Sequence, residues 1–302
     1  MSYNAVFFVK QKDKMAQIGE NMNTNSFFSA TRLGDNRFGI YVGVVILVII
    51  ANVLGSLPGG WAMVQQKEGY LHLPVYTLTG LMLLGFVVSL IVLWLCVKYI
   101  HKRNPMTLIS PTATVNWRRV AKSAGLWLFC SIVVELTTYW LFPDKYRFSL
   151  NWSDFLPSLV LGLLLIPLQT SFEELFFRGY LMQGIGSWNV WVGIAFTSVL
   201  FGLAHGFNGE VEAVGSLGIA MIYYIGVGLF FALLAYFDKT LELPLGIHAA
   251  NNIYAFLAVG YPSSSVPSAT IWMTTELNFP LMVGQWIVAL GIYLLLSPRL
   301  LK

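Results

Sequence analysis

The sequence predicts an all-α, polytopic membrane protein with about eight transmembrane helices and both termini in the cytoplasm. Of the 302 residues, 57% are hydrophobic and only 11% are charged, whereas soluble domains carry about a quarter charged residues. The hydrophobic residues form runs of about 20, the length that a helix needs to cross a bilayer core of about 30 Å. The distribution of Lys and Arg between these runs predicts the orientation.

The hydrophobic segments lie at residues 39–56, 76–98, 123–142, 158–181, 189–207, 213–237, 244–260 and 280–297. A polar, basic stretch from Lys98 to Lys122 separates the first two spans from the other six. We therefore divide the chain into a cytoplasmic N-terminal tail (1–37), two accessory helices with a basic cytoplasmic loop (38–122), and a six-helix membrane core (123–302).

The basic residues favour an orientation with both termini inside. In that orientation, fifteen of the 18 Lys and Arg residues lie in inside segments, and only Lys67, Lys145 and Arg147 lie outside. This bias follows the positive-inside rule, so the net charge of +4 reflects topology and we expect no nucleic-acid partner. The outside segment 261–280 contains Pro and Ser, which predict solvated turns with at most a short surface helix.

Two adjacent carboxylates and a guanidinium, Glu173, Glu174 and Arg178, end the segment 158–181. Each charged side chain at bilayer depth costs about 3 kcal/mol on insertion scales, so such groups must pair, face a wet cavity or perform chemistry. Glu174 and Arg178 have the spacing at which a carboxylate and a cation pair on one helix face. Glu173 points elsewhere and is left available as a general base. The alternative is that all three are solvated at the cytoplasmic helix end.

Two of the four histidines also lie in hydrophobic segments, His205 in 189–207 and His248 in 244–260. His248 and Asn252 are four residues apart and therefore project from the same helix face. A single histidine on an apolar helix is more often a structural residue than a catalyst. Because polar groups occur on three hydrophobic segments, a common functional site is the favoured interpretation.

Other polar or reactive side chains are assigned no function. Cys96 and Cys130 lie in hydrophobic segments and are expected to be buried free thiols. His72 and His101 lie in connecting loops and are expected to be solvated. Glu135, in the third span, is expected to accept a structural hydrogen bond from a neighbouring Thr or Tyr.

Three motifs resemble those of the CAAX protease and bacteriocin-processing family of intramembrane endopeptidases, also called the Abi family. They are Glu-Glu-x-x-x-Arg at Glu173, Glu174 and Arg178, Phe-x-x-x-His at Phe201 and His205, and His-x-x-x-Asn at His248 and Asn252. Each motif alone is weak evidence, but their order, spacing and placement on separate hydrophobic segments are specific. The resemblance covers residues 154–260.

The resemblance implies peptide hydrolysis within the membrane, near its cytoplasmic side. The implied roles are water activation by Glu173 and His205, oxyanion stabilisation by His248 and Asn252, and support of the site by Glu174 and Arg178. The implied partners are the lipid bilayer and a peptide substrate, either a lipidated C-terminus or a bacteriocin or leader peptide.

A metal-free glutamate mechanism is favoured, and no cofactor is expected. A Glu/His/His set can form a three-ligand catalytic zinc site, so Glu173, His205 and His248 are the ligands if zinc is used. Against zinc, the chain has no His-Glu-x-x-His helix, and Asn252 suits an oxyanion hole better than a metal shell.

The depths of the motif residues set a condition on the fold. Counted from Trp188, His205 lies about 17 residues, or roughly 26 Å, from the inner face, which is too deep to meet Glu173. The conflict is reduced if residues 183–192 lie along the inner membrane interface and the span begins near Gly193.

Two other function classes fit the same residues. The first is a non-enzymatic immunity or scaffold protein of the same family that keeps the motif residues as a polar core. The second is a proton-coupled transporter, since carboxylates and histidines at depth also form proton relays. The spans show no clear inverted duplication with broken helices, which disfavours a transporter. The sequence indicates neither the substrate nor the oligomeric state.

Overall fold

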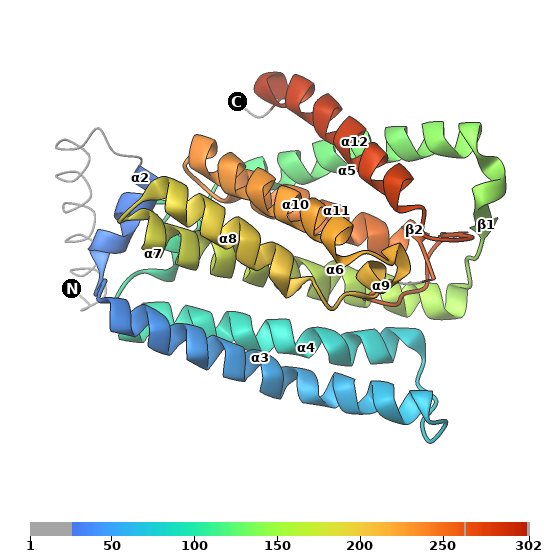
Figure 1. Cartoon of the computed structure of the whole chain (residues 1–302), viewed down its shortest axis with the longest axis horizontal. Coiled ribbons are helices and arrows are strands. Elements are labelled where there is room, and N and C mark those ends of the chain that lie inside the picture. Colours follow the sequence, from blue (N-terminus) through green and yellow to red (C-terminus); the bar gives the residue numbers. More distant parts are fainter. Residues whose placement is uncertain (1–25, 263, 301–302) are drawn as a thin grey trace.

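The computed structural model describes residues 26–262 and 264–300, and in this part the protein is a helical bundle with a small sheet at one end (Figure 1). Six helices of this part are long and apolar enough to cross a membrane. They are α3 (Phe38–Lys67), α4 (Val75–Leu95) with its π-helical continuation η2 (Cys96–Ile100), α5 (Trp117–Leu141), α6 (Trp152–Glu174) with its continuations η5 (Leu175–Met182) and α7 (Gln183–Gly186), α10 (Leu217–Asp238) and α12 (Phe279–Leu300).

The remaining helices are shorter. They are α2 (Ser26–Ser29), η1 (Ala30–Leu33), η3 (Pro105–Leu108), η4 (Pro143–Lys145), α8 (Val190–Ala204), α9 (Gly209–Val214) and α11 (Glu242–Leu257). The predicted spans 189–207 and 244–260 correspond to α8 and α11, with 15 and 16 residues. Both are shorter than the 20 or so residues of a typical transmembrane helix. The described part of the chain therefore has six helices of membrane-crossing length, whereas eight were predicted.

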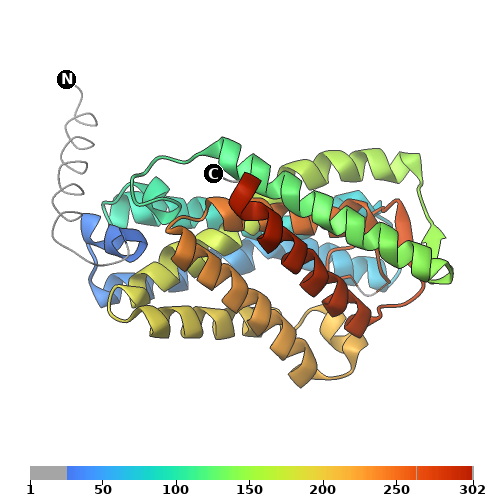
Figure 2. The ribbon, with the colours of Figure 1, turned by 90° about the horizontal axis from the view of Figure 1, so that it is seen from above.

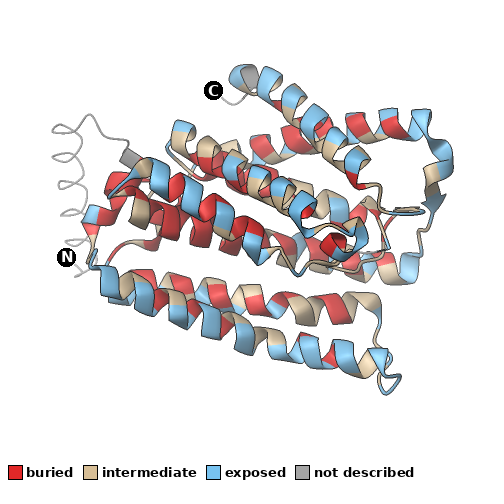
Figure 3. Cartoon of the chain, in the orientation of Figure 1, coloured by how far each residue is buried: buried red, intermediate tan, exposed pale blue. Residues whose placement is uncertain are grey.

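The outward faces of the long helices are exposed (Figure 3), and many of their exposed side chains are large and apolar. Leu54, Ile222 and Leu295 are 60%, 76% and 76% exposed. In the hydrophobic 18-residue stretch of each of the six long helices, at most 39% of the residues are buried inside the protein. Because soluble monomers rarely expose contiguous apolar patches larger than a few hundred Å², this surface is that of a multi-pass membrane protein whose outer side chains contact lipid.

The two helices predicted to be accessory, α3 and α4, form a hairpin along one side of the bundle (Figure 1). Small residues let their backbones approach: a Cβ on Gly59 would lie 2.7 Å from the backbone of Met82, and one on Gly85 would lie 3.0 Å from the carbonyl oxygen of Asn52. Such small-residue contacts are typical of helix pairs in membranes. α4 in turn packs against α6, which carries the first motif.

One continuous helix of 35 residues runs from Trp152 to Gly186 through α6, η5 and α7. A short turn follows, and α8 begins when the Asn189 side chain accepts the backbone N–H groups of its first turn. Residues 183–192 therefore form the end of this long helix, a turn and the start of α8, rather than one separate segment. The polar Gln183 is fully buried and donates to the carbonyl oxygen of Thr107 at 3.0 Å.

A three-stranded sheet departs from the all-α prediction, although the described chain is mostly helical. Its order is β1 (Tyr146–Phe148), β3 (Trp272–Thr274), β2 (Val259–Gly260), with β1 antiparallel and β2 parallel to β3. The segment 261–280, expected to form turns with at most a surface helix, thus supplies a strand. Its pairing joins segments far apart in the chain, which local sequence patterns do not encode.

The predicted cytoplasmic tail, residues 1–37, lies outside the described residues up to residue 25. Its remaining part packs on the bundle, because Phe27 is fully buried and Phe28 is only 3% exposed. The Phe28 ring occupies the space beside Gly186, where a Cβ would lie 2.2 Å from it. Phe27 and Phe28 are therefore part of the hydrophobic core.

Candidate active site

α6 brings a buried amide and two buried carboxylates into the bundle. Gln169, Glu173 and Glu174 are 8%, 6% and 0% exposed. Gln169 Nε2 donates to Glu173 Oε1 at 2.7 Å, as the four-residue spacing allows. Glu173 Oε2 and Glu174 Oε2 have no hydrogen-bond partner among the described residues. The alternative that these carboxylates are solvated at a helix end is therefore wrong.

Arg178, in the π-helical segment η5, is fully buried and pairs with Glu174 as predicted, with 3.0 Å between Nη1 and Oε1. Its Nη2 donates to the carbonyl oxygen of Gly228 on α10 at 3.1 Å. Its guanidinium also lies 4.3 Å from the centroid of the Phe201 ring, which adds a cation–π contact. Gly228 also lets α10 approach α8 closely, because a Cβ there would lie 2.8 Å from the carbonyl oxygen of Ser198 on α8.

His248 of α11 lies between the two carboxylates. Its Nδ1 is 2.7 Å from Glu174 Oε1, an oxygen that also accepts an N–H of Arg178, so Nδ1 carries the proton and donates. Its Nε2 lies 3.4 Å from Glu173 Oε2, close enough for an ion pair but without hydrogen-bond alignment. Two facing lone pairs would repel, so this contact is favourable when a proton lies between Nε2 and Oε2. The imidazole also stacks on Phe231, with centroids 5.0 Å apart.

Asn252 reaches Glu173 through Gln169. Its Nδ2 donates to Gln169 Oε1 at 3.2 Å, and its Oδ1 accepts from Asn251 Nδ2 at 3.1 Å. Trp127 Nε1 in turn donates to Asn251 Oδ1 at 3.3 Å. Sequence analysis missed Gln169 and Trp127 as parts of this network. The four-residue spacing between Gln169 and Glu173 was an available signal for the first, whereas nothing local indicated the second.

His205 follows the last residue of α8 and is half-buried. Its Nδ1 donates to the Phe201 carbonyl oxygen at 2.7 Å, which leaves Nε2 as an acceptor. Its ring stacks on Tyr224 of α10, with centroids 4.8 Å apart and planes at 23°. Within the part of the chain that the structure describes, His205 makes no hydrogen bond or ion pair with Glu173 or His248.

The antiparallel packing of η5 and α8 nevertheless places His205 at about the same level along the bundle as Glu173. The rings of Phe177 and Phe201 meet at 5.3 Å. Glu173 precedes Phe177 by four residues and His205 follows Phe201 by four, so both lie about one turn further in the same direction. The expected conflict in depth does not arise, because the helix of Glu173 continues to Gly186 and both residues lie at similar distances from the turn.

A catalytic zinc site needs three protein ligands around one point. Among the described residues, no group of three or more His, Cys, Asp and Glu side chains is arranged to hold a metal ion. The imidazole of His248 is instead engaged by two carboxylates.

His101, predicted to be solvated, is buried at 4% exposure, and that prediction is wrong. Its Nδ1 lies 2.7 Å from the Asp35 carbonyl oxygen, and its Nε2 lies 2.8 Å from the Tyr180 hydroxyl. This burial lowers the pKa of His101 below its ordinary value. His72 is exposed, as predicted.

The remaining predictions about isolated polar groups are confirmed. Glu135 accepts hydrogen bonds from the hydroxyls of Tyr146 and Tyr254, the second at 2.9 Å. Cys96 and Cys130 are buried free thiols.

A family model described as type II CAAX prenyl endopeptidase Rce1-like matches residues 150–254, a segment that contains all three motifs. The uncharacterized protein YyaK of Bacillus subtilis (strain 168) is 31% identical over 202 residues, which are 66% of this chain and 67% of that protein. No solved structure matches the chain.

Proposed function

Because the chain belongs to the Rce1-like family of type II CAAX prenyl endopeptidases, we propose that it hydrolyses a membrane-associated peptide inside the bilayer with a glutamate-activated water. The observation that supports this proposal most is the contact of one imidazole, that of His248, with both carboxylates of α6. With His248 protonated, the set formed with Glu173, Glu174 and Arg178 has no net charge, and burial of a neutral, mutually paired set costs least.

Glu173 is the general base of the proposed reaction. Gln169 holds its Oε1, so its Oε2 is left to take a proton from the water that attacks the peptide carbonyl carbon. His205 lies on the opposite helix, and its acceptor Nε2 holds the second hydrogen of that water. This step requires no metal or other cofactor.

His248 and Asn252 stabilise the oxyanion of the tetrahedral intermediate. When the substrate binds, the Nε2–H of His248 turns from Glu173 to the carbonyl oxygen, and Asn252 Nδ2 donates beside it. A donor of this kind contributes about 3 kcal/mol to the barrier reduction. Glu173 then gives its proton to the leaving amine as the C–N bond breaks, so the carboxylate is regenerated. Glu174 and Arg178 keep His248 oriented by holding its Nδ1–H.

We also propose that α8 and α11 cross the membrane beside the six long helices, that both termini lie in the cytoplasm, and that the site opens there. The bias of Lys and Arg towards these segments supports the orientation. So does the fold, because α3 begins and α12 ends on the half of the bundle away from the sheet (Figure 1). The substrate is then a peptide presented at the inner face, either a lipidated C-terminus or a bacteriocin or leader peptide.

A second candidate function is a non-enzymatic immunity or scaffold protein. One observation favours it: Glu174 and Arg178 are fully buried and bind each other, as a structural polar core would. The two functions differ in whether Glu173 is needed for peptide cleavage.

The test compares peptide termini in membranes that contain the wild-type protein, Glu173→Gln or His205→Ala. We expect new termini only with wild type, because both variants lack a group that holds the water. Glu135→Gln is the matched control, since Glu135 is another partly buried carboxylate in a span and accepts hydrogen bonds from Tyr146 and Tyr254. Equal cleavage by Glu173→Gln at normal expression would contradict the enzymatic proposal.

A further inference from the structure

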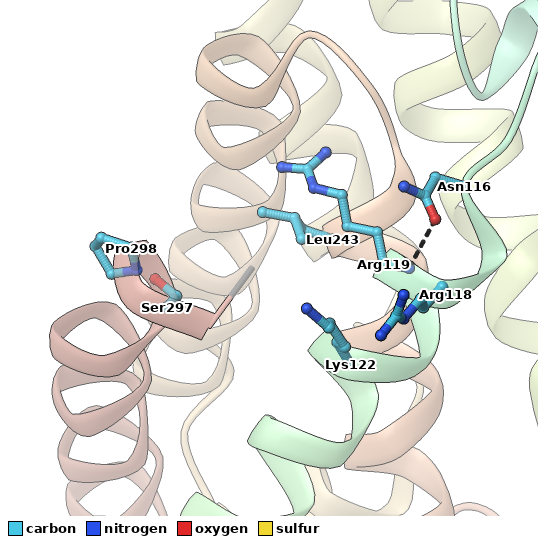
Figure 4. Close-up of a pocket in the computed structure, with 7 residues that line it drawn as sticks. All are labelled: Asn116, Arg118, Arg119, Lys122, Leu243, Ser297 and Pro298. Carbon is cyan, nitrogen blue, oxygen red and sulfur yellow. Dashed lines mark hydrogen bonds between the residues drawn. The ribbon is translucent and has the colours of Figure 1, made fainter. Parts of the chain in front are cut away.

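A basic cavity lies at the start of α5, away from the candidate active site. It has a volume of about 640 Å³. Figure 4 shows the cations of α5 on one side and the last residues of α12 on the other. The lining residues are Asn116, Arg118, Arg119, Lys122, Leu243, Ser297 and Pro298. Its volume lies within the range of roughly 300–1,000 Å³ of ligand sites in proteins.

Three cations within two turns of α5 line this cavity, and they differ in how they are held. Arg119 is fixed by ion pairs with Asp238 and Glu242, whose side chains are only 9% and 7% exposed. Arg118 is exposed and makes no hydrogen bond or ion pair with any described residue. Lys122 is also exposed. The accessible surface of the cavity is therefore positive.

The first turn of α5 adds to this positive character. Asn116 caps the helix by accepting the backbone N–H of Arg119 at 3.1 Å. The amino end of a helix carries about half a unit of positive charge, which favours an anion. Together with the cations, this end of α5 favours a phosphate group as ligand.

The position of the cavity indicates which phosphate compound it takes. α5 begins and α12 ends here, and both are of membrane-crossing length; Figure 2 shows α12 running beside α5 towards this end. Trp117, 60% exposed, lies at the start of α5, where interfacial aromatic residues are typical. Leu294 and Leu295, one turn before Ser297, are 49% and 76% exposed and continue the apolar surface into the membrane. A ligand here has a charged head at the interface and room for an acyl chain below it.

We infer that this cavity binds the phosphate headgroup of an anionic lipid. Arg118 and Lys122 contact the phosphate, while Leu243 and Pro298 form the apolar wall beside it. Arg119 keeps α5 in place through its ion pairs with α10 and α11. Basic pockets between membrane helices bind anionic headgroups in this way. The inference is independent of whether the protein cleaves peptides.

Native mass spectrometry of the full chain, released from nanodiscs of phosphatidylglycerol or phosphatidylcholine with the same acyl chains, tests the inference. We expect one phosphatidylglycerol to be retained in preference to phosphatidylcholine. Arg118→Ala with Lys122→Ala should weaken this retention about thirty-fold, at roughly 1 kcal/mol for each cation. Both residues are exposed, so the variant should fold.

The matched control removes two other cations, Lys67→Ala with Arg147→Ala, and should retain lipid as wild type does. Equal retention of the two lipids, or equal weakening by both double variants, would overturn the inference. A free anion is the competing ligand. If inorganic phosphate at millimolar concentration displaces phosphatidylglycerol, the cavity is a site for soluble anions and the lipid assignment is wrong.

Discussion

Replacing Arg178 with Met should strongly destabilise the protein. Arg178 is fully buried, lies 3.0 Å from Glu174 and donates to Gly228. The substitution keeps an unbranched side chain but removes the guanidinium from the fully buried Glu174, which keeps only its contact with His248. Removing one partner of a buried ion pair costs about 3–5 kcal/mol. At about 4 kcal/mol, the ratio of folded to unfolded protein falls by roughly a factor of 1,000.

The assay is denaturant unfolding in detergent micelles, followed by tryptophan fluorescence. A double variant, Arg178→Met with Glu174→Gln, distinguishes loss of the charge pair from loss of packing. The second substitution removes the uncompensated charge, and its amide still offers an oxygen to His248, so more than half of the lost free energy of unfolding should return. Arg147→Met, at an exposed strand position, is the control and should change stability by less than about 0.5 kcal/mol.

The charge-pair explanation fails if Arg178→Met alone lies within about 1 kcal/mol of wild type, because the buried Glu174 would then keep its contact with His248 but lack the guanidinium that balances the second carboxylate of the site. It also fails if the double variant is no more stable than the single one. In that case the cost would come from the lost contacts with Gly228 and Phe201 rather than from the charge of Glu174.

Three further results are expected. Gln169→Leu should lower peptide cleavage about 10- to 100-fold at unchanged expression, because Glu173 Oε1 loses its donor and the carboxylate is no longer oriented; unchanged turnover in a vesicle cleavage assay would contradict this. Gly228→Ala should lower the unfolding free energy by about 1–3 kcal/mol, since its Cβ would lie 2.8 Å from the Ser198 carbonyl oxygen, and Gly226→Ala, with open space around it, is the control. The pKa of His101 is lowered from 6.5 in the folded protein, so its contribution to stability is present above pH 6.5 and is lost as the pH falls below that value. The free energy of unfolding should therefore differ less between pH 7.5 and pH 5.0 for His101→Gln than for wild type.

Much of the site could be predicted because its first elements are local. The pairing of Glu174 with Arg178 follows from helix geometry alone, since residues four apart lie on one face. The membrane class and the six long helices follow from runs of hydrophobic residues that water would not accommodate. The position of Glu135 within a hydrophobic segment likewise predicted a structural carboxylate, although its partners Tyr146 and Tyr254 lie on other elements.

Other features required contacts between distant segments. Placement of His248 between Glu173 and Glu174 depends on how α11 packs on α6. The burial of His101 depends on the contact between Asp35, which precedes α3, and the end of the helix formed by α4 and η2. The basic residues beside His101 in the sequence therefore wrongly indicated a solvated side chain. The register that brings His205 to about the same level along the bundle as Glu173 depends on the continuation of one helix to residue 186, which an apolar pattern ending at 181 did not indicate.

The sequence by itself determined that this is a helical membrane protein, which hydrophobic segments form it, and which polar residues those segments carry. These properties depend on composition and on spacing within single helices. The tertiary structure decided which of those residues meet, that Gln169 and Trp127 extend the network, and that α5 and α12 enclose a basic cavity. These properties depend on side chains from separate helices, and their register is set by packing across the whole bundle.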